Sequence, residues 1–228
     1  MLEHLAIISV IGGLVALDHT EALQTMFSQP LLVGLIAGFI WGDLSSGLKI
    51  GLLLQLVYLW VMPIGTAVSP DPAIGSLVSG GGFVILTRLI PGRPNLILLV
   101  ILVFTVFFSL FAGWTLTRQR QLNSWLLYRA DICAEKARTR GFDWLFLLSL
   151  SGSFVRGLVV TGLGMACTIL VLTPLVRHLT LVPETYLQGL ELTVWGLGIG
   201  SMMHLFGSGR KPLLWVAGTV LGFMVLFS

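Results

Sequence analysis

The chain has 228 residues, of which 56% are hydrophobic and only 10% are charged, and its formal net charge is +3. About a quarter of the residues of an ordinary soluble domain are charged, and a soluble protein of this size could not cover its surface with so few ionised groups. The composition therefore excludes a soluble globular protein and indicates an integral membrane protein. At about 20 residues for each spanning helix, the chain has room for roughly six to eight spans.

Apolar runs in the N-terminal half of the chain differ in length. They occupy residues 5–17, 31–41, 48–62, 73–89 and 96–116. Only the last run is an uninterrupted span of full length. The other runs are short or are interrupted by glycine and proline. Transporters commonly place their substrate beside discontinuous helices near the membrane midplane. The pattern therefore favours a transporter over a rigid helical bundle.

The C-terminal half begins with the one long hydrophilic segment, residues 117–143, which carries six basic and three acidic residues. The positive-inside rule places such a segment in the cytoplasm. Helical spacing at 122–137 predicts a helix that lies along the membrane surface. We therefore expect a single membrane domain, 1–228, with spans in 1–116, the cytoplasmic segment 117–143 and further spans in 144–228.

The apolar run 144–176 is too long for one upright span. Its length predicts a tilted or broken helix, or two short elements with a bend near Gly162 or Gly164. Two more apolar runs follow, at 186–206 and 213–227.

Polar groups inside apolar runs are informative, because each costs a few kcal/mol at the bilayer centre. Gln55 lies in the middle of the run 48–62. Its amide both donates and accepts hydrogen bonds, which suits a sugar hydroxyl, and the alternative is a hydrogen bond between helices. We adopt the binding role. Asp43, between two apolar runs, is either a substrate or gating carboxylate or the N-cap of the next helix, and both roles stay open here.

The proline-rich break at 63–72 is the strongest local feature of the sequence. Pro70 and Pro72 bracket Asp71, so that a helix cannot continue through it. The break also offers the hydroxyls of Thr66 and Ser69 and unpaired backbone carbonyls. Such a segment is either a loop outside the membrane or the tip of a re-entrant hairpin, whose irregular backbone must be buried or line a cavity. We adopt the hairpin.

Several sequence signals of catalysis are absent. The chain has no P-loop, no GxSxG and no HExxH motif. Cys133 and Cys167 form no CxxC pair, so neither a disulfide framework nor a metal site is indicated. We therefore expect no catalytic residue, no metal and no cofactor in this chain, and no nucleic acid among its partners.

A set of short motifs in the first third of the chain follows a family pattern. The motifs are Leu17-Asp18, Gln29-Pro30-Leu31, Gly38, Gly42-Asp43, Gly47 with Gly51, Leu54-Gln55, Ile64-Gly65 and Pro70-Asp71. In these residues the stretch 17–79 resembles enzyme IIC of the mannose/fructose/sorbose class of the phosphoenolpyruvate-dependent sugar phosphotransferase system. A weaker match follows at Ala130-Asp131 with Ala134 and Ala137.

The resemblance implies an all-α, polytopic helical bundle in the bacterial inner membrane, with broken helices and at least one re-entrant hairpin. It implies that the chain is not phosphorylated, and that it forms with a IID membrane subunit the path for a hexose-type sugar. Cytoplasmic IIA and IIB proteins would phosphorylate that sugar, and we expect the complex to be an oligomer. The expected sugar-binding residues are Gln55, Asp71, Asp43, Ser69 and Thr66.

Two positions depart from the family pattern, since the family usually has Glu at Gln55 and Arg at Gln29. They motivate a second hypothesis, in which the chain keeps the fold as a membrane scaffold or regulatory subunit that transports nothing. A third hypothesis is an unrelated channel or carrier for small solutes.

Overall fold

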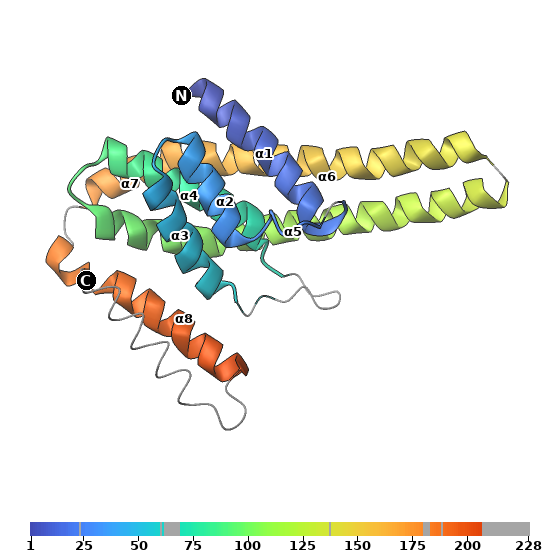
Figure 1. The fold of residues 1–228 in the computed structure, drawn as a ribbon. Coiled ribbons are helices and arrows are strands. Elements are labelled where there is room, and N and C mark those ends of the chain that lie inside the picture. The colour runs from blue at the N-terminus through green and yellow to red at the C-terminus, as the bar shows by residue number, and fades with distance from the viewer. Residues whose placement is uncertain are drawn as a thin grey trace.

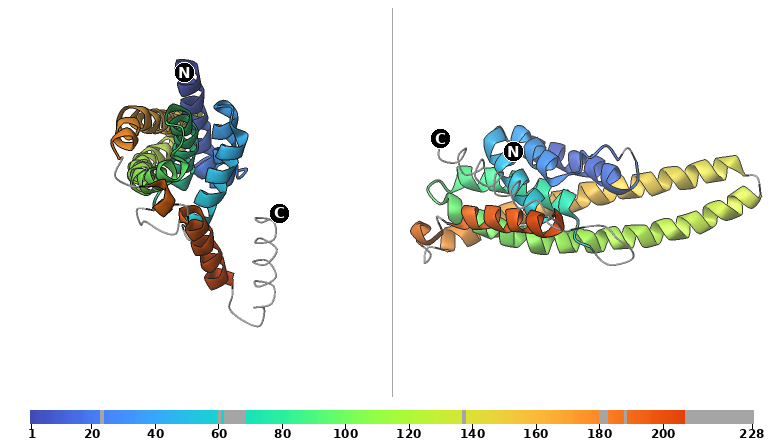
Figure 2. Two further views of the ribbon diagram at one scale, coloured as in Figure 1. Left: turned by 90° about the vertical axis from the view of Figure 1, so that its left-hand side faces the viewer. Right: turned by 60° about the horizontal axis from the view of Figure 1, so that its bottom comes forward.

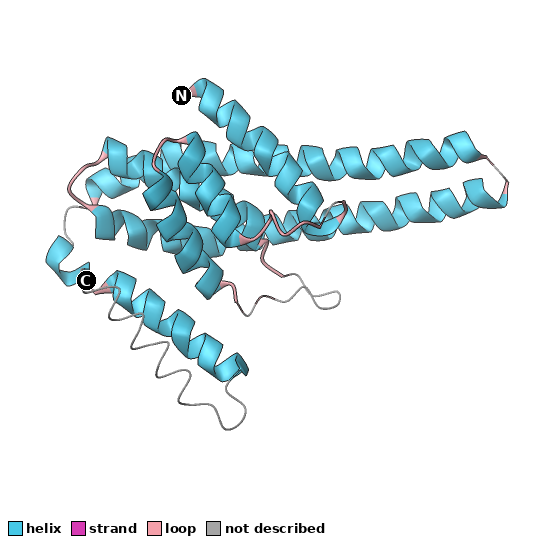
Figure 3. Cartoon of the chain, in the orientation of Figure 1, coloured by secondary structure: helices cyan, strands magenta, loops and turns pink. Residues whose placement is uncertain are grey.

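The computed structural model describes residues 1–206 apart from 23, 60, 62–68, 137, 180–182 and 188, and within this part every regular element is a helix (Figure 3). A π-helical turn, Thr168–Leu172, and a 3-10 turn, Glu184–Leu187, join some of the helices. The α-helices are α1 (Leu2–Thr20), α2 (Pro30–Ile40), α3 (Leu44–Val57), α4 (Pro72–Leu89), α5 (Pro94–Glu135), α6 (Thr139–Cys167), α7 (Thr173–His178) and α8 (Leu190–Phe206).

Proline and aspartate set the starts of these helices. Proline occupies the first position of α2, α4 and α5, where its fixed φ angle suits a helix and its missing N–H leaves no hydrogen bond unmade. The Asp43 and Asp71 carboxylates accept hydrogen bonds from backbone amides in the first turns of α3 and α4. Both residues are thus N-caps, as preferred at such positions.

Among the described residues, four helical segments are long and apolar enough to cross a membrane: α1, α4, α5 and the continuous stretch Thr139–His178. Helices α2 and α3 are apolar but have only 11 and 14 residues, fewer than the roughly 17 that a span needs. The sequence predicts a re-entrant hairpin at 63–72, but residues 62–68 lie outside the described part, so the hairpin stays a prediction.

Helix α4 lies at the centre of the bundle and contacts α1, α2, α3, α5 and α6 (Figure 2). Every residue from Ala73 to Leu86 is buried. Its three consecutive glycines lie against other helices, because a Cβ on Gly80 would fall 3.2 Å from the Ala37 side chain and one on Gly82 would fall 3.0 Å from Thr168. The glycine-rich run therefore serves close packing on all sides of a central helix.

Two helix crossings bring backbones into direct contact. Between α2 and α3, a Cβ added to Gly47 would lie 2.5 Å from the Gly38 Cα atom. Between α1 and α6, a Cβ added to Gly157 would lie 2.4 Å from the Gly12 carbonyl oxygen. Small residues at such crossings are typical of membrane helices, which associate through close packing rather than through the hydrophobic effect.

The far half of α5 and the first half of α6 run side by side beyond the other helices (Figure 1). We call residues 117–135 and 139–150 the α5–α6 arm. Helix α5 has 42 residues and is therefore about 63 Å long, roughly twice the thickness of the hydrocarbon core. The prediction of a separate surface helix at 122–137 is wrong, because no glycine or proline follows Gly113 in α5 to end the helix.

The run 144–176 is part of one continuous helical stretch, Thr139–His178, which does not break at Gly162 or Gly164. Helix α6 continues through both glycines, and a Cβ on Gly164 would fall 2.5 Å from the Phe108 ring, so that this glycine serves packing. The irregular π-helical turn comes at Thr168–Leu172, directly before Pro174 in the first turn of α7. Proline has no N–H for the regular helical bond, which accounts for a local widening just before it.

Candidate functional site

A cavity of about 270 Å³ lies where the end of α1, the loop after it, the starts of α2 and α4 and the end of α3 meet. Polar side chains make up much of its wall. They include Asp18, Ser28, Gln29, Gln55 and Tyr58, with Pro72 beside them. We call it the Gln55 cavity.

Gln55 joins α3 to the start of α2. Its Oε1 atom accepts a hydrogen bond from the Leu31 backbone amide at 3.3 Å, and its Nε2 atom donates one to Gln29 Oε1 at 3.3 Å. Both bonds are longer than the usual N–H···O distance of about 2.9–3.0 Å. The amide is half-buried, so it can exchange these weak bonds for bonds to a ligand in the cavity. The interhelical bond and the binding role considered from the sequence are therefore compatible.

Asp18 organises the loop that closes one side of the Gln55 cavity. Its Oδ1 atom accepts hydrogen bonds from the Thr25 amide at 2.7 Å and from the Thr25 hydroxyl at 2.6 Å. Its Oδ2 atom accepts one from the Ser28 amide at 2.9 Å. The loop needs this support, since Gln24 and Met26 adopt positive φ angles of 48° and 67°, which are unfavourable for residues other than glycine.

The importance of Asp18 does not follow from local sequence reasoning. The residue appeared only as part of a family motif, with no role given to it. The sequence does carry a signal for this role of Asp18, because a carboxylate in the last turn of an apolar helix is followed within ten residues by Thr25 and Ser28. Such carboxylates often bind the backbone amides of a nearby turn.

Replacing Asp18 with asparagine is expected to lower the thermal stability of the protein and to weaken binding in the Gln55 cavity. The amide group would turn one acceptor into a donor facing the Ser28 amide, and a lost charge-assisted hydrogen bond costs about 1.5–3 kcal/mol. Thermal unfolding in detergent measures the stability. Asp131→Asn, on the exposed arm, is the matched control, and equal stability of the two variants would contradict this role.

Asp71 is fully buried and makes four contacts that are structural. Its Oδ1 atom caps α4 by accepting a hydrogen bond from the Ile74 amide, and its Oδ2 atom lies 3.1 Å from Arg156 Nη1. Its backbone amide donates to the Ser109 carbonyl, and its backbone carbonyl accepts from the Gly75 amide. The next residue, Pro72, lines the Gln55 cavity. Asp71 therefore lies behind the cavity wall, in an ion pair with α6.

Arg156, in α6, is the partner of Asp71 in this ion pair. Only its Nη1 atom is hydrogen-bonded in the described structure, to Asp71 and, at 3.4 Å each, to the Ala112 carbonyl and the Thr115 hydroxyl. Its Nε and Nη2 atoms are buried without a partner among the described residues. The ion pair thus joins α4 to α6 at the cost of two unmade hydrogen bonds.

The structure does not bring the five expected sugar-binding residues together. Asp43 caps α3 after the end of α2, whereas Gln55 contacts the start of α2, so the two lie at opposite ends of this helix pair. The hydrogen bond from the Ser46 amide holds the pKa of the Asp43 carboxyl below its ordinary value. Ser69 is half-buried with its carbonyl against Gly113, and Thr66 lies outside the described residues.

The sequence of this chain matches a known protein family. A sequence profile of the family described as "PTS system sorbose-specific iic component" matches residues 3–226. The chain belongs to this family. The resemblance found in its first third thus extends over nearly the whole sequence, and the third hypothesis, an unrelated channel or carrier, is wrong.

Relatives of this IIC protein are themselves named as IIC components. It is 31% identical over 207 residues to the sorbose-specific EIIC component of Klebsiella pneumoniae, which covers 87% of this chain and 73% of the relative. It is 27% identical over 214 residues to the mannose-specific EIIC component of Escherichia coli K12, covering 89% of this chain and 70% of the relative.

A solved structure shares the fold of this IIC protein. A cryo-EM structure of the mannose transporter ManYZ in complex with a microcin matches with a TM-score of 0.60 at 18% identity, covering 98% of this chain and 93% of that chain. Together with the four apolar helices, these matches confirm an all-α, multi-pass protein of the bacterial inner membrane. The protein is the IIC component of a transporter of the mannose/sorbose type.

Proposed function

We propose that this IIC protein forms, with a IID membrane subunit, the path by which a hexose-type sugar enters the cell, and that the sugar binds in the Gln55 cavity. The observation that carries the proposal is a weakly bonded, half-buried amide in a polar cavity between membrane helices. Gln55, Gln29 and Ser28 offer both donors and acceptors, which a sugar hydroxyl needs. Asp18, in the wall, and Asp71, behind it, act as positioning residues.

The charges of the arm support a direction for transport. The arm carries most of the basic residues of segment 117–143, and such segments face the cytoplasm. The Gln55 cavity lies beside Pro72, next to the hydrogen bond between Asp71 and Ser109, and Ser109 belongs to the half of the span 96–116 nearer the arm. We infer that the cavity lies in the cytoplasmic half of the bilayer, within reach of IIA and IIB proteins that phosphorylate the sugar.

A membrane partner is part of the proposal. One solved structure with the same fold is that of the mannose transporter ManYZ, and its example supports a membrane complex. Large apolar side chains along the arm, such as Trp125, Leu127 and Trp144, are more than half exposed, and an apolar surface of this extent on a segment outside the bilayer suits another subunit of the complex. We expect the complex to be an oligomer built around these surfaces.

Uptake measurements with Gln55 variants test the sugar site. In proteoliposomes with IID, IIA and IIB, Gln55→Ala is expected to raise the KM for sugar up to about tenfold, the value of one neutral hydrogen bond. Gln55→Glu, which restores the usual residue of the family, should retain uptake. Gln121→Ala on the exposed arm is the control, and a KM for Gln55→Ala equal to that of the control would remove Gln55 from the site.

The same assay separates the transporter from the scaffold hypothesis. A folded wild-type protein that assembles with IID but takes up no mannose, fructose or sorbose would favour the non-transporting subunit. Asp71→Ala is a poor probe here, because loss of a buried ion-pair partner is expected to disturb folding itself.

A further inference from the structure

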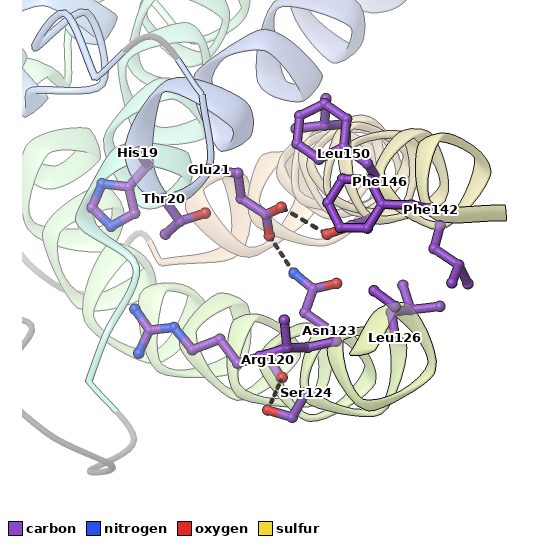
Figure 4. A pocket seen from close by; sticks show the side chains of 14 residues that line it. His19, Thr20, Glu21, Arg120, Asn123, Ser124, Leu126, Phe142, Phe146 and Leu150 are labelled. Atoms are coloured by element: carbon purple, nitrogen blue, oxygen red, sulfur yellow. Dashed lines mark hydrogen bonds between the residues drawn. The ribbon is translucent and has the colours of Figure 1, made fainter. Parts of the chain in front are cut away.

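A second and larger cavity, of about 660 Å³, lies between the end of α1 and the two helices of the arm (Figure 4). Its volume falls within the range of about 300–1,000 Å³ that is usual for small-molecule sites. His19 lines both this space, which we call the arm cavity, and the Gln55 cavity. The last turn of α1 is therefore a wall shared by two adjoining spaces, and the arm cavity is lined by both polar and apolar side chains.

Glu21 is the polar centre of the arm cavity. Its carboxylate accepts hydrogen bonds from Asn123 Nδ2 at 2.6 Å, from Ser153 Oγ at 2.5 Å and from Ser149 Oγ at 3.2 Å. Glu21 directly follows the last residue of α1, Asn123 belongs to α5 and the two serines belong to α6. Figure 4 shows Asn123 pointing at the Glu21 carboxylate. The Gln119 amide continues the network by donating to Asn123 at 3.1 Å.

Glu21 and Arg120 line the arm cavity with opposite charges, and in the described part of the chain they form no ion pair with each other. In the described part of the chain, Glu21 forms no ion pair, and its three side-chain donors are neutral groups. Arg120 also lines the cavity and forms no ion pair there. A carboxylate has about four acceptor positions and a guanidinium has five N–H donors, so both groups have capacity left for a ligand that donates and accepts.

Aromatic rings complete the lining. Phe142 and Phe146 project from α6 at the cavity, on the side of Glu21 away from His19 (Figure 4). Polar groups at one end and ring faces at the other suit a molecule with hydroxyls on its edge and C–H groups on its face. A monosaccharide has this combination.

We propose that the arm cavity is a second sugar-binding chamber, which receives sugar from the Gln55 cavity past His19 before phosphorylation. Glu21, Asn123 and Arg120 bind the sugar hydroxyls there, and Phe146 packs against the ring. The proposal rests on the proposed sugar path and adds a second site to it. No side chain considered from the sequence as a sugar ligand belongs to this chamber.

Protection of single engineered cysteines from thiol labelling tests the second chamber separately from the proposed sugar path. In a Cys133→Ser, Cys167→Ser background, one cysteine is placed at a time: Ser124→Cys in the arm cavity, Met26→Cys in the Gln55 cavity and Ser151→Cys on the exposed side of α6. Mannose, fructose or sorbose, added at saturating concentration, is expected to slow thiol labelling at positions 124 and 26 several-fold and to leave position 151 unchanged. Adding Glu21→Gln should abolish protection at 124 and keep it at 26.

The outcomes distinguish the two proposals. Protection at 26 but not at 124 would overturn the second chamber and leave the sugar path in place. Protection at neither position, together with absent uptake, would overturn the path itself. A third outcome is that position 124 is protected in phospholipid vesicles but is labelled freely in detergent, with or without sugar. This outcome would assign the arm cavity to a lipid. If Glu21→Gln does not fold, protection at 124 in the parent background still decides the point.

Discussion

Arg156→Met is expected to destabilise the protein by about 3–5 kcal/mol, the usual effect of removing one partner from a buried ion pair. The two side chains are only 6% and 1% exposed, so water cannot replace the lost partner of Asp71. Methionine has a similar length and adds no clash. The expected measurement is a fall in the thermal unfolding temperature in detergent, with reduced yield of folded protein.

Two companion variants make the ion-pair prediction specific. Arg156→Met combined with Asp71→Asn should recover part of the loss, because the neutral amide no longer leaves a buried charge unpaired while its oxygen can still cap α4. Arg140→Met removes an exposed arginine of the arm and should change stability by less than about 0.5 kcal/mol. An Arg156→Met protein as stable as Arg140→Met would show that the ion pair contributes little.

Gly47→Val is expected to cost about 3 kcal/mol or more and to disable the Gln55 cavity. A Cβ at Gly47 would lie 2.5 Å from the Gly38 Cα atom and 2.6 Å from the Gly34 carbonyl oxygen. These are backbone atoms of α2, so the two helices must move apart, and overpacking of this kind costs about 1–3 kcal/mol even where side chains can adjust. The movement would also break the bond between Gln55 and the Leu31 amide.

Substitution of a second helical glycine is the control that separates the effect of close helix packing from the effect of helix propensity. Gly196 lies in α8, and a Cβ added there meets no atom of the described residues within 4 Å. Gly196→Val should therefore fold normally and support uptake with an ordinary KM. If Gly47→Val and Gly196→Val behaved alike in thermal unfolding and uptake, the close crossing of α2 and α3 would not control the cavity.

Local chemistry made some features of the structure predictable. Asp43 caps a helix, which is one of the two roles that its position between apolar runs predicted. Asp71 was expected as a sugar ligand, and its capping of α4 was not predicted. Gln55 was recognisable because an amide inside an apolar run needs partners, and its partners are Leu31 and Gln29. Gly162 and Gly164 were misjudged, because a glycine that permits close packing looks the same in sequence as a glycine that breaks a helix.

The sequence by itself determined membrane insertion, the all-helical class and the family, because hydropathy and short motifs are local properties of the chain. Only the tertiary structure decided which polar groups meet. Arg156 pairs with Asp71 across 85 positions, and Glu21 meets Asn123 and Ser149 across 102 and 128 positions. The hydropathy of a run shows that it is buried or faces lipid, but it does not show which helix lies beside it. The sugar path that we propose therefore uses a different set of residues from the set expected from the sequence, with Gln55 common to both.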